Sequence, residues 1–399
     1  MPERSYKGLY CYAWDLLDEG IAEVAARMRG CGLDTVTLAA AYHAGKFLRP
    51  HGKSGKIVIP EDGTIYFRHD PTRYGRVKPV PNSLLADHDP FAELERLAPD
   101  LGRAAWVVAF HNTRLGEAHP DLCARNCFGD PYVYALSPAH PEARAYVVAL
   151  CADLARAYAP AVITLETPGF QPFDHGYHHE FYFTPLNEWA KVLLGMDFSP
   201  AVRDAAKTAG IDTEPLRRRI CAALESWLGA EIVPSEAMAQ QWLMADLVLD
   251  PDWQAFLRWR CELVSSVVAE IKAALPRSTA LRVIPSVQRS SARGWIEGSD
   301  LAALAKAGDG LEWCAYEPSA EALAADTFDV RRRVGADAVL TAIMRPAPPD
   351  LAGGADCAAA ARILRRAGVQ GIAFYNYGHF RLAALDRIAE ATAAWESAA

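Results

Sequence analysis

Eight segments rich in β-forming residues recur along the whole chain, and stretches with helical periodicity lie between them. The segments cover residues 8–12, 35–38, 105–110, 162–166, 281–286, 312–316, 338–343 and 371–375. Most are dense in Val, Ile, Leu and aromatic residues, which is typical of strands buried on both faces. Eight strands, each followed by a helix, predict an α/β fold of the (β/α)8 TIM-barrel type. A doubly wound open sheet is the alternative, but its usual glycine-rich phosphate turn, GxGxxG or GxxxxGK[ST], does not occur in the sequence.

The chain length fits one large domain. It has 399 residues, 51% of them hydrophobic, and we interpret residues 1–399 as a single barrel domain. Residues 42–90 form too long an interval for a simple connection, and we expect a long loop with a hairpin over the barrel mouth. Residues 170–250, after the fourth strand, contain several helical patterns and predict a helical insertion.

The predicted insertion carries more large apolar side chains than a solvated helix face should show. Examples are Trp189, Trp227, Trp242 and Met244. We expect these helices to pack on one another and roof the site, because they follow a strand end at the mouth. A self-complementary interface in a homodimer is the alternative.

Charge and hydropathy exclude several classes of partner. The net charge is −8 and there is no basic run, which argues against nucleic acid. No apolar stretch reaches the length of about 18 residues that a membrane span needs, and residues 1–7 lack an apolar signal core. The nine cysteines are scattered and form no CxxC pair, so neither a disulfide framework nor a cysteine zinc site is expected. We therefore expect a cytoplasmic protein that acts on a small molecule or an oligosaccharide.

Two of the predicted strands end in a glutamate and are then broken by a proline. One strand reads Val162-Ile-Thr-Leu-Glu166 before Thr167 and Pro168, and the other leads to Glu317 and Pro318. Sites in parallel α/β folds are built at the carboxyl ends of strands. Two carboxylates at one mouth are what acid–base chemistry on a glycosidic bond requires. Either glutamate could instead cap a helix or pair with an arginine.

Nearly every predicted strand is followed by polar or aromatic residues suited to a polyhydroxylated ligand. Aromatic faces stack on sugar C–H groups, while Asn, His, Arg and Asp form hydrogen bonds with hydroxyls. The candidate substrate-binding residues at these ends are Trp14, Asp15, Tyr42, His43, Lys46, His111, Asn112, Arg114, Gln288, Arg289, Tyr316, Arg345, Tyr375, Asn376 and Tyr377. Individually, Asp15 could cap a helix, Arg345 could pair with a surface acid and Tyr42 could belong to the core.

The loop at residues 174–180 concentrates imidazoles and carboxylates. It contains His175, His178 and His179 between Asp174 and Glu180. These side chains could ligate Zn or Mn, but the spacing matches neither HxH nor HExxH. We favour a sugar-binding loop, and histidines that satisfy buried backbone groups are a further alternative.

Residues 119–166 carry a sequence of features in a fixed order. A His119-Pro turn precedes the run Leu136-Ser-Pro-Ala-His-Pro-Glu-Ala-Arg144-Ala-Tyr146, and a strand ending in Glu166 follows. This order resembles the corresponding part of glycoside-hydrolase-like TIM-barrel families. The resemblance implies a barrel whose fourth strand presents a carboxylate to a saccharide.

These observations predict a carbohydrate-active enzyme, in particular a glycoside hydrolase with Glu166 as nucleophile or base and Glu317 as acid. Tyr316 and the histidine loop would raise the pKa of the acid. A separation of about 5–5.5 Å between the two carboxyl groups would indicate retention of the anomeric configuration, and a separation of about 6.5–9.5 Å would indicate its inversion. We expect no cofactor and no resident metal. A metal-dependent sugar isomerase or lyase, with His43, His111, Glu166 and the histidine loop as ligands of a divalent metal, is one alternative, and a non-catalytic saccharide-binding barrel is another.

Overall fold

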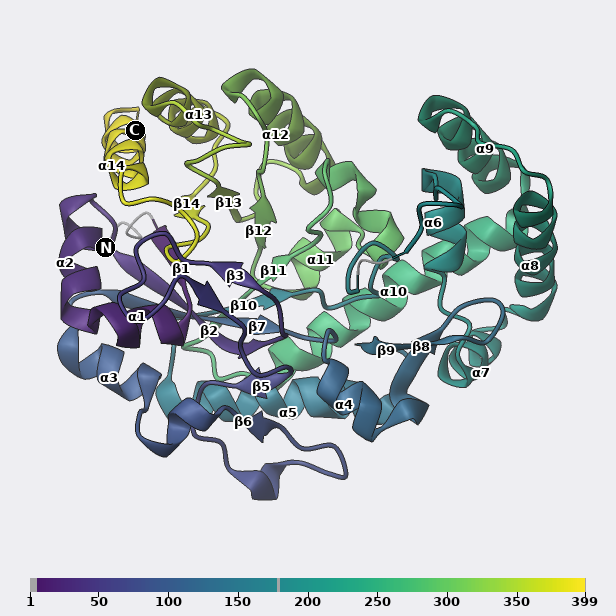
Figure 1. Ribbon diagram of the computed structural model, residues 1–399, viewed down its shortest axis with the longest axis horizontal. Coiled ribbons are helices and arrows are strands. Elements are labelled where there is room, and N and C mark those ends of the chain that lie inside the picture. Colours follow the sequence, from purple (N-terminus) through teal and green to yellow (C-terminus); the bar gives the residue numbers. More distant parts are fainter. Residues whose placement is uncertain (1–5, 178–179, 399) are drawn as a thin grey trace.

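The computed structural model describes residues 6–177 and 180–398, and its centre is a closed barrel of parallel strands (Figure 1). In chain order the barrel strands are β1 (Tyr6–Cys11), β2 (Thr35–Tyr42), β7 (Gly102–Val108), β10 (Val162–Glu166), β11 (Ala280–Ile284), β12 (Leu311–Cys314), β13 (Leu340–Met344) and β14 (Gly371–Phe374). Each strand pairs in parallel with the next one in this order. Because β1 pairs with both β2 and β14, the sheet closes on itself. The predicted (β/α)8 fold is confirmed, and the eight predicted strands differ from the observed ones only at their ends.

Helices surround the barrel, and at least one follows each strand. The outer helices are α2 (Ile21–Gly30), α3 (Pro90–Leu97), α5 (Pro141–Tyr158), α10 (Pro251–Ala274), α11 (Leu301–Ala307), α12 (Ala320–Val334), α13 (Gly354–Arg366) and α14 (Ala384–Ser397). Local sequence explains their starts: Asp250 caps α10 by accepting hydrogen bonds from the backbone N–H groups of Asp252 and Trp253, and Pro251 occupies the first helical position. The buried residues of α10 then recur every three or four positions up to Ile271, which gives the helix one face against the barrel.

The long segment after β2 folds back over the carboxyl ends of the first strands. It contains the antiparallel pair β3 (Phe47–Leu48) and β4 (Ile57–Val58), and then β5 (Thr64–Ile65), which pairs antiparallel with the end of β2, and β6 (Val80–Pro81). Buried Arg49 fixes this segment to the short helix α1 (Ala13–Glu19) through ion pairs of 2.6 Å to Asp15 and 2.7 Å to Asp18. The loop is therefore tied to the end of the barrel where β1 terminates.

The connection from β7 to α5 is also elaborated. It contains α4 (Thr113–Ala118), the antiparallel pair β8 (Cys123–Arg125) and β9 (Pro131–Leu136), and a short 3-10 turn at Pro120–Leu122. Further 3-10 turns occur at Pro71–Arg73, Ser83–Ala86 and Ser291–Glu297. This places most of the irregular structure at the connections that run from strand to helix.

Four helices precede α10 in the connection after β10. They are α6 (Glu188–Leu194), α7 (Pro200–Thr208), α8 (Glu214–Gly229) and α9 (Glu236–Leu249), and α8 and α9 form the right edge of the view in Figure 1. Their tryptophans account for part of the predicted apolar surface, because Trp189 packs edge-on against Trp227 and Trp242 at ring distances of 6.1 and 5.9 Å. Met244 stays exposed on α9. A roof over the site and a dimer interface both stay predictions.

Among the helices of residues 6–177 and 180–398, none combines the length and the apolarity that crossing a membrane requires.

Candidate active site

A cavity of about 210 Å³ opens at the carboxyl ends of the barrel strands. Its walls come from all eight strands or the residues that follow them, and five of the lining residues are tyrosine or tryptophan. The residues that line it are Tyr10, Tyr42, His43, Trp106, Glu166, His175, Ile284, Val287, Cys314, Tyr316, Ile343, Arg345 and Tyr375. This is the end of the barrel at which TIM-barrel enzymes place their sites.

Glu166 is the carboxylic acid of this cavity, and it ends strand β10. Its Oε2 accepts a hydrogen bond of 2.5 Å from the indole Nε1 of Trp106 on the neighbouring strand β7. Burial raises the pKa of Glu166 to about 7, and the Trp106 hydrogen bond, which favours the carboxylate, only partly opposes this. Glu166 therefore exchanges its proton close to neutral pH.

A second buried acid, Glu297, lies near Glu166 and was not expected from the sequence. It ends the 3-10 turn Ser291–Glu297 that follows β11, and its Oε1 accepts a hydrogen bond of 2.5 Å from Ser286 Oγ. Burial, with a smaller contribution from the charge of Glu166, raises the pKa of Glu297 to about 8. Its backbone carbonyl accepts from the N–H of Phe170 at 3.0 Å, which ties the loop after β10 to this turn. Glu297 does not line the cavity.

Phenol groups and one guanidinium complete the polar part of the wall. The hydroxyl of Tyr12 donates to that of Tyr42 at 3.0 Å and lies 3.2 Å from that of Tyr375. Arg345 places its guanidinium 3.6 Å from the ring centre of Tyr316. Rings that offer both a face and a hydroxyl, beside a cation, suit a ligand with C–H faces and many hydroxyl groups.

A deeper acid, Glu312 on β12, was also not expected. It is fully buried and accepts hydrogen bonds of 2.9 Å from both Tyr10 and Thr164. Tyr10 lines the cavity from the other side, so Glu312 supports the floor from inside the barrel. Inward-facing residues fill TIM barrels in layers, and no pattern in the sequence indicated that this layer would be polar.

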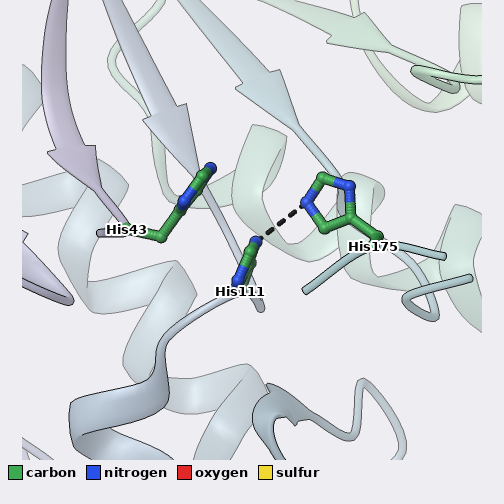
Figure 2. Close-up of side chains that lie close together, drawn as sticks. All are labelled: His43, His111 and His175. Carbon is green, nitrogen blue, oxygen red and sulfur yellow. Dashed lines mark hydrogen bonds between the residues drawn. The ribbon is translucent and has the colours of Figure 1, made fainter. Parts of the chain in front are cut away.

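Three histidines converge beside the cavity, as Figure 2 shows. His43 follows β2, His111 follows β7 and His175 lies in the loop after β10. The rings of His43 and His111 are stacked with centres 4.1 Å apart, and His175 Nε2 shares a hydrogen bond of 2.8 Å with His111 Nδ1. One ring nitrogen from each residue lies within 4.8 Å of the other two. Of the predicted ligands for a metal, the structure thus brings these three together.

The histidines border two hollows, which share His43 and His175 as lining residues. His43 and His175 line the inner cavity with Glu166 and also an outer one of about 610 Å³, which in addition contains His111, Lys46, Asp62 and Tyr134. Burial lowers the pKa of His43, and it lowers that of His111 further because the two neighbouring imidazoles add to the effect. Both rings are therefore neutral at pH 7.

The other predicted catalytic acid, Glu317, follows β12 and lies outside the lining of the Glu166 cavity. It is partly buried, and burial raises its pKa, helped by the charge of Asp326 and opposed by Arg289. Since β10 and β12 run parallel in one barrel, Glu166 and Glu317 follow strand ends at the same face. The pairing of the two carboxyl groups stays a prediction.

Several predicted substrate-binding residues have partners within the fold. Asp15 is buried against Arg49, and the Asn112 side chain caps α4 by accepting from Leu115 N–H. Asn376 accepts from Gly378 N–H, and the Tyr377 hydroxyl donates to Glu19. These bonds explain the residue types without a ligand, so a sugar contact from these four side chains stays a prediction.

Four further candidates, Trp14, Arg114, Gln288 and Arg289, also lie outside the two hollows. Trp14 stacks on Tyr12 at 4.2 Å, and Arg289 forms an ion pair with Asp350. Gln288 and Arg114 follow β11 and β7 but do not line either hollow. His178 and His179 lie outside the described residues. The candidates that line one of the hollows are Tyr42, His43, Lys46, His111, Glu166, His175, Tyr316, Arg345 and Tyr375.

Comparison with known proteins gives a fold and no closer relationship. No family model matches the chain, and no curated protein does. Among solved structures, the glycoside hydrolase domain of PgaB (BpsB) from Bordetella bronchiseptica is similar, with a TM-score of 0.55, 15% identity and 93% of each chain covered. The β-galactosidase of the psychrophilic Marinomonas ef1 has a TM-score of 0.57 and 13% identity, with 98% of this chain and 59% of that one covered. The resemblance to glycoside-hydrolase-like barrels is thus confirmed at the level of the fold.

Proposed function

We propose that this protein is a carbohydrate-active enzyme that hydrolyses a glycosidic bond, with Glu166 as its central catalytic residue. One observation carries the proposal: a buried carboxyl group with a pKa raised to about 7 lies in an aromatic cavity at the carboxyl ends of the barrel strands. A carboxylic acid that keeps its proton near pH 7 is what protonation of a glycosidic oxygen needs. The fold shared with two glycosidases is consistent with this chemistry.

We assign Glu166 the role of general acid, which reverses the division of roles expected from the sequence. Oε2 of Glu166 accepts a hydrogen bond from the N–H of Trp106. In a protonated carboxyl group the oxygen without the proton is the better acceptor, and the other oxygen carries the hydrogen. The proton therefore belongs on Oε1. In the reaction, Oε1–H donates to the leaving-group oxygen as the glycosidic bond breaks, and the resulting carboxylate is held by Trp106.

Glu317 is our candidate for the second carboxylate, as base or as nucleophile. The position of Glu317 supports this assignment: it follows β12, which is two strands from β10, and lies on the same face of the barrel as Glu166. Substrate binding would then span from the Glu166 cavity towards Glu317. Tyr316, directly before Glu317, lines the cavity, and Arg345 covers one face of its ring, so the cavity wall leads along the chain to Glu317.

The test is a screen of the purified chain against a panel of aryl glycosides and polysaccharides, with release of the aryl alcohol or of reducing ends as readout. The comparison is Glu166→Gln, which keeps the shape and removes the acidic proton. Glu321→Gln on the exposed face of α12 is the matched control. We expect at least one substrate to be cleaved by wild type and control and not by Glu166→Gln. Hydrolysis that is equal in all three proteins would overturn the proposal.

A metal-dependent sugar isomerase or lyase is the second candidate. The observation that favours it is the group of three histidines that borders the same cavity as Glu166. Metal-dependent chemistry would be abolished by dialysis against a chelator and restored by a divalent ion, whereas a two-carboxylate hydrolase would be unaffected.

A further inference from the structure

We propose that His43, His111 and His175 form a binding site for one divalent transition-metal ion, such as Zn²⁺, at the mouth of the barrel. The inference goes beyond the proposed hydrolase and holds or fails independently of it. Neutral imidazole nitrogens are preferred ligands of Zn, Cu, Ni and Co, and they are poor ligands for Mg and Ca. The chemistry of the donor set therefore selects the class of ion.

The spacing of the nitrogen atoms is close to what a metal requires. His111 Nδ1 and His175 Nε2 are 2.8 Å apart. Two nitrogens bound at about 2.0–2.1 Å to a tetrahedral Zn²⁺ are about 3.3 Å apart, so an opening of roughly 0.5 Å would admit the ion in place of the shared proton. One ring nitrogen from each of the three histidines, His43 included, lies within 4.8 Å of the other two.

His43 has the tautomer that a ligand needs. Its Nδ1 lies 2.7 Å from the backbone carbonyl oxygen of Ala44, and a carbonyl can only accept, so Nδ1 carries the hydrogen. This leaves the lone pair on Nε2, and a backbone carbonyl on the other ring nitrogen is the usual partner of a metal-binding histidine. In Figure 2 the ring of His43 lies parallel to that of His111. Binding requires His43 to turn out of this stack so that Nε2 points at the ion.

The backbone holds the three side chains in place from three separate connections. His43 directly follows β2, and His111 is bridged to Ala135 and directly precedes the Asn112 cap of α4. His175 is followed by Gly176, which has a φ of +131°, and a Cβ there would lie 2.7 Å from the ring of Tyr134. Only glycine permits this loop to run so close to Tyr134 and deliver His175 to His111.

Three protein ligands leave one tetrahedral position open, which is the arrangement of catalytic rather than structural zinc sites. The open position can face either of the two hollows, since His43 and His175 line both. A water molecule or a hydroxyl group of the ligand would complete the coordination. An ion there would stand between the Glu166 cavity and the outer hollow that contains Lys46.

One other group of potential ligands provides an internal control. Asp121, His140 and Glu142 also lie within ligand distance of one another, but they are on the surface. The guanidinium of Arg76 pairs with both carboxylates, at 2.6 Å from Asp121 and 2.5 Å from Glu142. A cation already occupies that group, so it should not bind a second one.

The test is equilibrium dialysis of the chelator-treated full chain against Zn²⁺, followed by metal analysis, and a parallel titration with Co²⁺ followed by visible absorption. We expect one ion per chain and the absorption of four-coordinate Co²⁺. His111→Ala and His175→Ala should each weaken Zn²⁺ binding by more than about 100-fold, the upper range for loss of a partner of a metal ligand. His140→Ala should bind as wild type does.

A thermal unfolding series with and without Zn²⁺ keeps the test independent of any single variant. Because an ion that binds only the folded state raises the unfolding temperature, Zn²⁺ should stabilise wild type and His140→Ala. His175→Ala, changed in a surface loop, should fold and show no such shift. The proposal is overturned if wild type binds no stoichiometric ion, if His175→Ala binds as well as wild type, or if His140→Ala is the variant that loses the ion.

Discussion

The indole N–H of Trp106 donates a hydrogen bond of 2.5 Å to Oε2 of Glu166 across two neighbouring barrel strands. This contact joins the carboxylic acid of the inner cavity lining to a fully buried ring. It favours the carboxylate form, while burial favours the protonated form more strongly. The balance of the two keeps the pKa of Glu166 near neutral pH, and it can be shifted by changing Trp106.

Trp106→Phe removes the hydrogen bond and keeps an aromatic ring. Because a hydrogen bond to a charged group is worth about 1.5–3 kcal/mol and one pKa unit is about 1.4 kcal/mol, the pKa of Glu166 should rise by about one unit or more. A general acid works while protonated, so the rate should fall above pH 7 in wild type and only at higher pH in Trp106→Phe. The measurement is kcat/KM against pH. An unshifted or a downward-shifted limb would argue against the acid role.

Glu166→Gln should stabilise the protein at high pH. The folded-state pKa of about 7 lies above the value of about 4.3 in an unfolded chain. Below pH 4 both states are protonated and the group has no effect. As pH rises from 4 to 7 only the unfolded state loses the proton, so wild type loses about 3 kcal/mol of unfolding free energy. Urea unfolding at pH 4, 6 and 8 should show the advantage of Glu166→Gln growing with pH, and a constant difference would contradict this.

Glu317→Gln tests the second carboxylate. Loss of a base or nucleophile should lower kcat by about 100-fold or more, while the unfolding temperature changes little because the side chain is only partly buried. Glu297→Gln provides the comparison, since that acid is fully buried yet does not line the cavity. If Glu297→Gln abolishes turnover and Glu317→Gln does not, the second carboxylate is Glu297.

Arg49→Met should act on stability and not on chemistry. It leaves Asp15 buried without its ion pair of 2.6 Å, and breaking a buried pair on one side costs about 3–5 kcal/mol. We expect chemical denaturation to report a loss of about this size, with KM unchanged at temperatures where the variant is folded. If KM rose while the stability stayed normal, the prediction that Asp15 binds substrate would be supported instead.

The barrel could be predicted because its strands are buried on both faces and read as runs of Val, Ile, Leu and aromatics. Glu166 was found for a related reason, since a charged residue at the end of such a run stands out. Glu312 and Trp106 were missed because they lie inside the runs, where one residue in two faces the barrel interior and the sequence does not tell which.

The three histidines show a second kind of feature that could not be predicted from the sequence. His43, His111 and His175 were each a candidate from its position after a strand, but their convergence depends on the order of β2, β7 and β10 around the barrel. The partners of Asp15 and Asn112 depend on loops that return to the mouth, where Arg49 and the cap of α4 use their side chains. Long loops of this kind have no periodicity from which such contacts could be predicted.

The most direct test of the central claim compares two leaving groups on the same sugar in wild type and Glu166→Gln. The alkoxide of an unactivated alkyl glycoside needs a proton from the enzyme to leave. The dinitrophenolate of a dinitrophenyl glycoside is a stable anion and leaves without one. If Glu166 is the acid, Glu166→Gln should slow the alkyl glycoside by about 10²–10⁴-fold and the dinitrophenyl glycoside far less. Equal slowing of both would make Glu166 a nucleophile or base, and hydrolysis of both at the wild-type rate would contradict a catalytic role for Glu166 altogether.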